Sequence, residues 1–346
     1  MSKEKYSPKE RLIKVINGEI VDRPPCICPG GMMNMIVEDI MDISGMTWPE
    51  AHENPQKMAE LTKSMYFNGG FENFGVPFCM TVEAESMGAK VSYGTKLTEP
   101  RIEEYPVLKL DDWRTLSDIS LSEGRVKVVL DAIKILKSGD YGVPLIGNIV
   151  GPVSLASSLL EPMEFYKAMR RKPQELHEFM EFVTDNIIKF AREEIKAGAD
   201  IIAISDPSGT GEILGPKLFN EYTVTYINKI IRAIKDEVPG GVIVHICGRL
   251  GSVYKELNAI ESPVLSFDSI TPVKEVATNV KNKVLMGNVS TLALDDGKQD
   301  ILRKIAGSCI NNGISILSPA CGIGTKTSID SIRTIVDVAS HYAVEE

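Results

Sequence analysis

The residues of this chain best suited to chemistry are one histidine and two cysteines. His245 and Cys247 interrupt an apolar run at 242–248 (VIVHICG), and Cys321 lies in the glycine-rich stretch LSPACGIGTKTS. A spacing of two residues along a strand places His245 and Cys247 on one face, about 6–7 Å apart. Imidazole nitrogen and thiolate sulfur suit zinc, whose bonds of about 2.0–2.3 Å allow one ion to bridge this pair. Cys321 is the best candidate for a third ligand.

A site with three such ligands would keep one position open for substrate. Three protein ligands on tetrahedral zinc leave a fourth position, which separates catalytic from structural zinc sites. A free thiol has a pKa near 8.5, and bound zinc stabilises an incoming thiol as its nucleophilic thiolate. The pattern therefore predicts a zinc site that activates a substrate thiol. For each cysteine by itself, the alternative is a small buried side chain.

Three carboxylates are candidates for a role beside this site. Glu83 and Glu85 lie two residues apart in MTVEAESMGA, and Asp206 lies in SDPSGTG after an apolar segment. Paired carboxylates can supply a general base or an oxygen ligand. We expect Glu85 to be the functional member of the pair, and Glu83 or Glu85 is a candidate for the fourth zinc position. Asp206 is a second catalytic candidate, with turn capping as its alternative.

The other cysteines and histidines are expected to be structural. Cys26 and Cys28 form a second Cys-x-Cys, for which packing is expected and an accessory role at the site is the alternative. The remaining residues of these types lie in apolar or polar helical contexts: Cys79, Cys309, His52, His177 and His341.

Eight short apolar segments bounded by Pro, Gly, Asp or Ser predict strands. They are 24–29, one within 75–82, 144–150, 200–205, 242–247, 264–268, 284–289 and 314–318. Helical spacing of apolar residues separates most of them, as in 173–198, which begins with Pro and ends with Gly. Eight alternating units predict a closed (β/α)₈ TIM-type barrel. An open doubly wound sheet is the rival fold, but the chain has no glycine-rich nucleotide-binding signature.

A barrel determines where the candidate ligands must lie. Active sites of barrels form at the C-terminal ends of the strands. His245 and Cys247 end the fifth predicted strand, and Cys321 follows the eighth, so Cys321 has to reach across the mouth from its loop. We expect one domain over residues 1–346, in which 30–140 add N-terminal helices or a cap to the barrel.

Composition narrows the classes of function. With a net charge of −9, the chain is a poor partner for nucleic acid or an anionic membrane surface. No apolar run approaches the roughly 18 residues of a membrane span. The charged N-terminus MSKEKYSPKERL lacks the apolar core of a secretory signal, so a cytoplasmic location with reduced cysteines is expected.

The sequence resembles the cobalamin-dependent methyltransferases of the uroporphyrinogen decarboxylase superfamily, above all the methylcobamide:coenzyme M methyltransferases. The resemblance covers essentially the whole chain. Its blocks occur in the usual order: TWPEAHENPQKMAEL, VPFCMTVEAESMGA, GADIIAISDP, VHICG, GNVST and SPACGIGTKT. The resemblance implies a (β/α)₈ barrel, zinc bound by His245, Cys247 and Cys321, and functional carboxylates at Glu85 and Asp206.

The implied reaction moves a methyl group from methylcobalamin to a zinc-bound thiol, with Glu85 or Asp206 relaying the thiol proton. The corrinoid is expected on a separate corrinoid protein, because the chain has no Asp-x-His-x-x-Gly carrier motif. Coenzyme M is the expected acceptor. The segment CICPGGMMNM (26–35) is similar to that of bacterial members whose acceptor is tetrahydrofolate, so both acceptors stay open.

Three other functions compete with this one. Uroporphyrinogen decarboxylase uses no metal and needs arginines for a substrate with eight carboxylates, whereas the region RPPCICPGGMMNM contains only Arg23. A non-catalytic accessory subunit of a corrinoid system would bind zinc without turnover. A cobalamin-independent methionine-synthase-like enzyme would use homocysteine as the acceptor.

Overall fold

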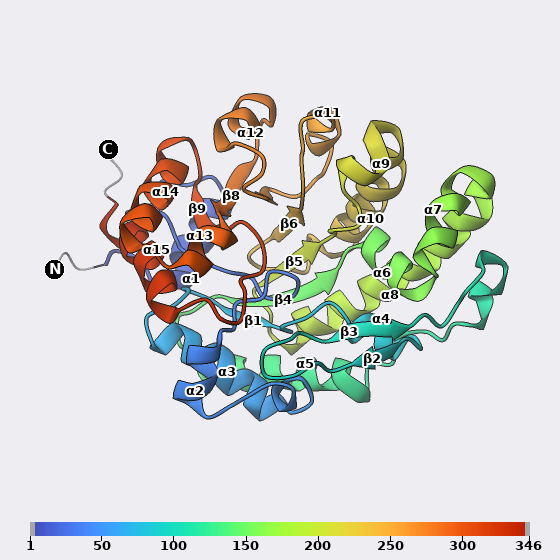
Figure 1. Ribbon diagram of the computed structural model, residues 1–346, viewed down its shortest axis with the longest axis horizontal. Coiled ribbons are helices and arrows are strands. Elements are labelled where there is room, and N and C mark those ends of the chain that lie inside the picture. The colour runs from blue at the N-terminus through green and yellow to red at the C-terminus, as the bar shows by residue number, and fades with distance from the viewer. Residues whose placement is uncertain (1–3, 343–346) are drawn as a thin grey trace.

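A computed structural model describes residues 4–342 as a curled parallel sheet surrounded by helices (Figure 1). Its seven strands are each parallel to the next, and they follow the chain order. They are β1 (Phe74–Val76), β4 (Leu145–Val150), β5 (Ile201–Ser205), β6 (Val242–Ile246), β7 (Val264–Phe267), β8 (Val284–Val289) and β9 (Ile316–Pro319). The architecture is a TIM-type (β/α) barrel, so the predicted fold class is confirmed.

The first predicted strand, 24–29, closes the barrel without forming a regular strand. Its only ladder contact is a parallel bridge between Cys26 and Leu317 of β9. On the other side, the amide of Asn73 bonds the backbone N–H and C=O of Cys28, at 2.9 and 2.8 Å. Three prolines in this segment remove backbone donors, which is why side-chain and single backbone bonds replace a ladder.

The second predicted strand is shorter than expected. β1 ends at Val76, and after Pro77 the chain enters the short helix α4 (Val82–Ser86). The strand predicted within 75–82 is therefore found at its start, where β1 includes residues 75 and 76, and the rest of that range is not strand. Glu83 partly replaces the missing strand pairing, because its Oε1 accepts the backbone N–H of Val150 at 2.8 Å.

From β4 onward the helices follow their strands and cover the outside of the sheet. They are α6 (Pro152–Leu159), α7 (Pro162–Arg171), α8 (Pro173–Ala197), α9 (Gly211–Leu218), the π-helix η3 (Phe219–Val224), α10 (Thr225–Ile234), α11 (Tyr254–Leu257), α12 (Val273–Asn279), α13 (Thr291–Asp296), α14 (Gln299–Asn311) and α15 (Ile329–His341). The predicted helix at 173–198 is confirmed as α8, whose apolar face is buried and which ends at Gly198 with φ 123°. Within residues 4–342, no helix is both long enough and apolar enough to cross a membrane.

The N-terminal part adds helices around the barrel, as expected. These are α1 (Pro8–Ile16), α2 (Glu38–Ser44), η1 (Glu50–His52), α3 (Pro55–Phe67), η2 (Leu110–Thr115) and α5 (Gly124–Lys137). The helices α2, α3 and α5 lie together on one side of the molecule in Figure 1. An antiparallel hairpin, β2 (Lys90–Ser92) with β3 (Arg101–Glu104), was not predicted.

Candidate metal centre

The structure brings His245, Cys247 and Cys321 together at the C-terminal ends of the strands. His245 lies near the end of β6, Cys247 follows that strand, and Cys321 lies two residues beyond β9. One donor atom from each residue lies within 4.8 Å of the others. His245 Nε2 is 3.0 Å from Cys247 Sγ, which is 3.8 Å from Cys321 Sγ. The loop after β9 thus carries Cys321 across the mouth to β6.

The orientation of the His245 ring follows from a bond to the next strand. Nδ1 of His245 lies 2.9 Å from the hydroxyl of Ser266, a fully buried residue of β7. The Ser266 hydroxyl also lies 3.7 Å from the Met33 sulfur, to which it can donate, and in that arrangement it accepts from His245. The proton of the neutral ring is then on Nδ1, and the lone pair of Nε2 faces the cysteines, as a metal ligand requires.

The donor set fits zinc. Two zinc–sulfur bonds of about 2.3 Å at a tetrahedral angle span about 3.8 Å, which matches the separation of the two sulfur atoms. The hydrogen bond from Cys247 lowers the pKa of Cys321, and the same bond raises the pKa of Cys247. One thiol of the pair therefore ionises readily, and the set combines thiolate with neutral imidazole.

Asp206 lies next to this cluster along the sheet but directs its side chain elsewhere. Its backbone N–H donates to the carbonyl of His245 at 3.2 Å. Its Oδ1 accepts the backbone N–H and the hydroxyl of Ser154, and its Oδ2 accepts the N–H of Val153. Burial raises the pKa of Asp206, although these hydrogen bonds oppose the shift. The carboxylate therefore caps the start of α6, and a Cβ at the preceding Gly151 would lie only 2.3 Å from the Cβ of Asp206.

Glu85 is held in an ion pair outside the cluster. Its Oε2 accepts from Nε of the buried Arg125, and its Oε1 accepts from the hydroxyl of Tyr93 at 2.7 Å. Arg125 also donates to the hydroxyl of Thr81 at 2.8 Å. Glu85 lines a cavity of about 500 Å³ that none of the three candidate ligands lines. Neither Glu85 nor Asp206 belongs to the group of donors formed by the histidine and the two cysteines.

Sequence reasoning missed two other acidic residues whose charges reach the cysteines. The charge of Asp268, which follows β7, raises the pKa of Cys247, after the bond to Cys321 and burial. Burial raises the pKa of Glu99, with smaller contributions from the charges of Cys79 and Cys321. Asp268 ends the predicted strand 264–268, so its place at a strand end was a usable signal. Glu99 lies in an irregular loop before β3, and no motif marks it.

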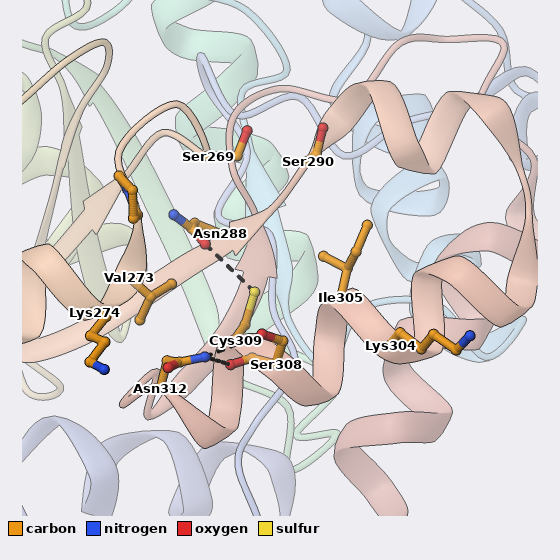
Figure 2. A pocket seen from close by; sticks show the side chains of 11 residues that line it. Ser269, Val273, Lys274, Asn288, Ser290, Lys304, Ile305, Ser308, Cys309 and Asn312 are labelled. Carbon is orange, nitrogen blue, oxygen red and sulfur yellow. Dashed lines mark hydrogen bonds between the residues drawn. The ribbon is translucent and has the colours of Figure 1, made fainter.

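The structure also contains a cavity away from the cluster. It has a volume of about 470 Å³ and lies between α12, β8 and α14 (Figure 2). Its lining includes Asn288 and Cys309 but none of the candidate site residues, and the Cys309 sulfur donates to the side-chain Oδ1 of Asn288 at 3.5 Å. Cys309 is buried there, and Cys26, Cys28 and Cys79 are buried as expected. His52 is buried as well, whereas His341 is exposed.

Comparison with known proteins assigns this arrangement to a family. The uroporphyrinogen decarboxylase (URO-D) family model matches residues 7–342. The chain belongs to the URO-D family. The methylcobamide:CoM methyltransferase MtbA of Methanosarcina acetivorans is 32% identical over 340 residues, which are 97% of this chain and 98% of that one. Uroporphyrinogen decarboxylase of Thermodesulfovibrio yellowstonii is 26% identical over 278 residues, 77% of this chain and 78% of that one.

A solved structure matches the chain over almost its full length. A methyltransferase from Methanosarcina mazei superposes with a TM-score of 0.89 at 29% identity, covering 97% of this chain and 99% of the other. The URO-D family member described here is thus a methyltransferase. The expected family and the expected class of enzyme are both confirmed.

Proposed function

We propose that this chain transfers a methyl group from a methylated corrinoid to a thiol held at a zinc ion, with coenzyme M as the acceptor. The observation that carries the proposal is the convergence of His245, Cys247 and Cys321 within 4.8 Å at the mouth of the barrel. Support comes from full-length similarity to an enzyme named for methylcobamide and CoM. The relative's name supplies the substrates, and the donor set supplies the chemistry.

The residues of the chain have distinct tasks in this reaction. His245, Cys247 and Cys321 hold the metal, and Ser266 keeps the His245 ring turned toward it. When bound, zinc lowers the pKa of a substrate thiol and presents it as a thiolate nucleophile. The strands β6 and β9 fix the ligands from two sides of the mouth. The fourth position is then left to the acceptor.

For Glu85 and Asp206, a direct catalytic role stays a prediction. Their contacts favour positioning roles, because Asp206 caps α6 beside β6 and Glu85 holds Arg125 against the loop after β1. We propose that the Asp206 carboxylate ties the end of β5 to the start of α6, the helix that follows β4. Glu83 Oε1 bonds the backbone N–H of Val150 on β4, and Glu83 is not a member of the group of donors formed by the histidine and the two cysteines.

Decarboxylation of a porphyrinogen fits the structure less well. The only arginine in the segment RPPCICPGGMMNM is Arg23. Arg23 is buried and paired, with Nη2 at 2.6 Å from Glu72 and 2.5 Å from Glu4. Its positive charge is therefore neutralised within the protein and is not available to a polycarboxylate substrate.

The decisive experiment is a methyl-transfer assay on the purified chain. Methylcobalamin is mixed with coenzyme M, homocysteine or tetrahydrofolate; its absorbance is followed, and the methylated product is identified by mass spectrometry. Zinc content is measured in parallel, before and after chelation. We expect about one zinc per chain and demethylation with coenzyme M, lost on chelation and restored by zinc.

Each other outcome points to a different function. Turnover with tetrahydrofolate or homocysteine in place of coenzyme M would overturn the acceptor but keep the metal site. Turnover by the zinc-free chain would overturn the metal site. Zinc binding without turnover, both with free methylcobalamin and with a methylated corrinoid protein, would favour an accessory subunit. We expect a corrinoid protein to be the natural donor, and the cytoplasmic location stays a prediction.

A further inference from the structure

Residues 30–36, which follow the irregular barrel segment 24–29, contact both sides of the candidate metal centre: the side of His245 and the loop that carries Cys321. Met33 accepts a hydrogen bond from Ser266, the residue that orients His245. The next residue, Asn34, lies against the loop of Cys321. The thiol of Cys28 donates to the carbonyl of Met33 at 3.1 Å and fixes the turn between them. One stretch of chain thus links the ligands of β6 with the ligand after β9.

Asn34 holds the Cys321 loop through both its backbone and its side chain. Its carbonyl accepts the N–H of Ile323 at 3.0 Å, and its side-chain Nδ2 donates to the carbonyl of Ile323 at 3.2 Å. The same Nδ2 donates to the carbonyl of Ile36, whose N–H bonds Oδ1 at 2.9 Å. Asn34 is completely buried, so water does not replace these bonds.

The approach of the two segments is close enough to require glycine in between. Gly322 directly follows Cys321, and a Cβ at this position would lie 2.5 Å from the carbonyl oxygen of Met32 and 3.0 Å from the N–H nitrogen of Asn34. The loop therefore cannot shift toward the segment. The side chain of Asn34 prevents the opposite movement, away from it.

We propose that Asn34 is a positioning residue for the metal centre, which sets the distance of Cys321 from His245 and Cys247. The inference rests on the proposed function, because it assumes that these three residues bind zinc. Residues around a metal site that fix its ligands typically change metal affinity 10–100-fold when mutated. Asn34 differs from such neighbours in acting on the loop backbone beside the ligand.

The test compares Asn34→Ala with a matched control. The control is Asn186→Ala, because Asn186 is also a buried asparagine but lies in α8. The change removes its bonds to the N–H of Ile119 and the carbonyl of Phe182, both at 2.9 Å. Zinc affinity is measured by competition with a chelator. Cobalt(II) is then substituted for zinc, and the thiolate-to-cobalt charge-transfer absorption reports how many cysteines bind the metal.

We expect Asn34→Ala to lower zinc affinity about 10–100-fold and to weaken the charge-transfer absorption. Asn186→Ala is expected to lower thermal stability similarly but to keep wild-type affinity and spectrum. Asn34→Asp keeps the acceptor for Ile36 and loses the donor to Ile323, so it should behave like Asn34→Ala.

The outcomes separate this inference from the proposed function. A wild-type chain that binds no zinc would overturn both. A wild-type chain with about one zinc, together with folded Asn34→Ala of unchanged affinity and spectrum, would overturn the positioning role alone. If Asn34→Ala does not fold, Gly322→Ala tests the same contact from the other side: a loss of affinity supports the role, and an unchanged affinity and cobalt spectrum overturn it.

Discussion

Two neighbouring strand ends of the barrel carry side chains of opposite use. His245, next to last in β6, turns its Nε2 toward two sulfur atoms, whereas Asp206, which follows β5, bonds the first turn of α6 with its carboxylate. The two residues are joined by a backbone hydrogen bond of 3.2 Å, so they share the same level of the barrel. Position at a strand end is therefore not enough to make a side chain part of a site.

The two strand ends differ in which side-chain atoms remain available to bind a metal ion. The carboxylate oxygens of Asp206 accept hydrogen bonds from backbone N–H groups and a hydroxyl that burial would otherwise leave unpaired. Within residues 4–342, the side-chain partners of His245 Nε2 and of the two sulfur atoms lie inside the cluster, and Cys321 also receives a backbone hydrogen bond from the adjacent Gly322. The mouth thus has a thiol side, formed by His245, Cys247 and Cys321, and a carboxylate side at Asp206, and the two differ in their hydrogen bonding.

Removing a cysteine from the thiol side should have the largest effect. Cys321→Ala is expected to lower zinc affinity by more than about 100-fold, since even residues behind the ligands account for 10–100-fold. Methyl transfer to coenzyme M should be lost with the metal. Cys309→Ala, a buried cysteine outside the cluster, is the control and should keep both. Full zinc and activity in Cys321→Ala would remove the distinction between these cysteines.

On the carboxylate side, Asp206→Ala should reduce stability rather than metal binding. The change removes three hydrogen bonds of a buried carboxylate, so we expect the free energy of unfolding to fall by about 2–4 kcal/mol. Urea denaturation measures this, and zinc content should stay near wild type. Activity that vanishes while stability and zinc are unchanged would instead support the direct catalytic role predicted from sequence.

For the buried carboxylate of Glu83, the free energy of unfolding should depend on pH. Burial raises its pKa from 4.5 to about 7, so the folded chain holds this proton more tightly than the unfolded chain does. The wild type should therefore lose stability as the pH rises from about 4.5 to 7. The loss is roughly 3 kcal/mol at about 1.4 kcal/mol per unit.

Glu83→Gln keeps an acceptor for the N–H of Val150 and has no charge to bury. Relative to wild type, it should gain up to about 3 kcal/mol at pH 8 and nothing at pH 4, as measured by urea denaturation at both values. An equal gain at the two pH values would show that the burial of charge is not the cause. Glu85→Gln, which breaks the ion pair with Arg125, should show no gain at pH 8.

The smallest effect is expected at the residue behind His245. Ser266→Ala removes the acceptor of the Nδ1 proton and should weaken zinc binding about 10-fold. Ser262→Ala is the control, because Ser262 is also buried beside β7 but bonds the carbonyl of Val242 at the opposite end of β6. Equal zinc affinities in the two variants would argue against control of the ring by Ser266.

Much of the barrel was predictable from sequence, because its buried strands are short apolar runs with clear boundaries. Residues 24–29 were predictable as a barrel element but not as an irregular one, since their pairing depends on Asn73 in a distant segment. The three candidate ligands could be grouped from residue type and strand position. The partners of the carboxylates could not: Ser154 lies 52 residues before Asp206, and Arg125 lies 40 residues after Glu85.

If the proposed zinc site is correct, the origin of Cys321 in the loop after β9 affects how the protein would acquire its metal during synthesis. Cys321 follows Cys247 by 74 residues, and the strands β7, β8 and β9 are made between them. A growing chain that has reached β6 offers an incoming ion one imidazole and one thiol, which bind it weakly. Tight loading would then have to wait until β9 is in place and Cys321 reaches the end of β6, so zinc occupancy would report that the last strand has joined the sheet.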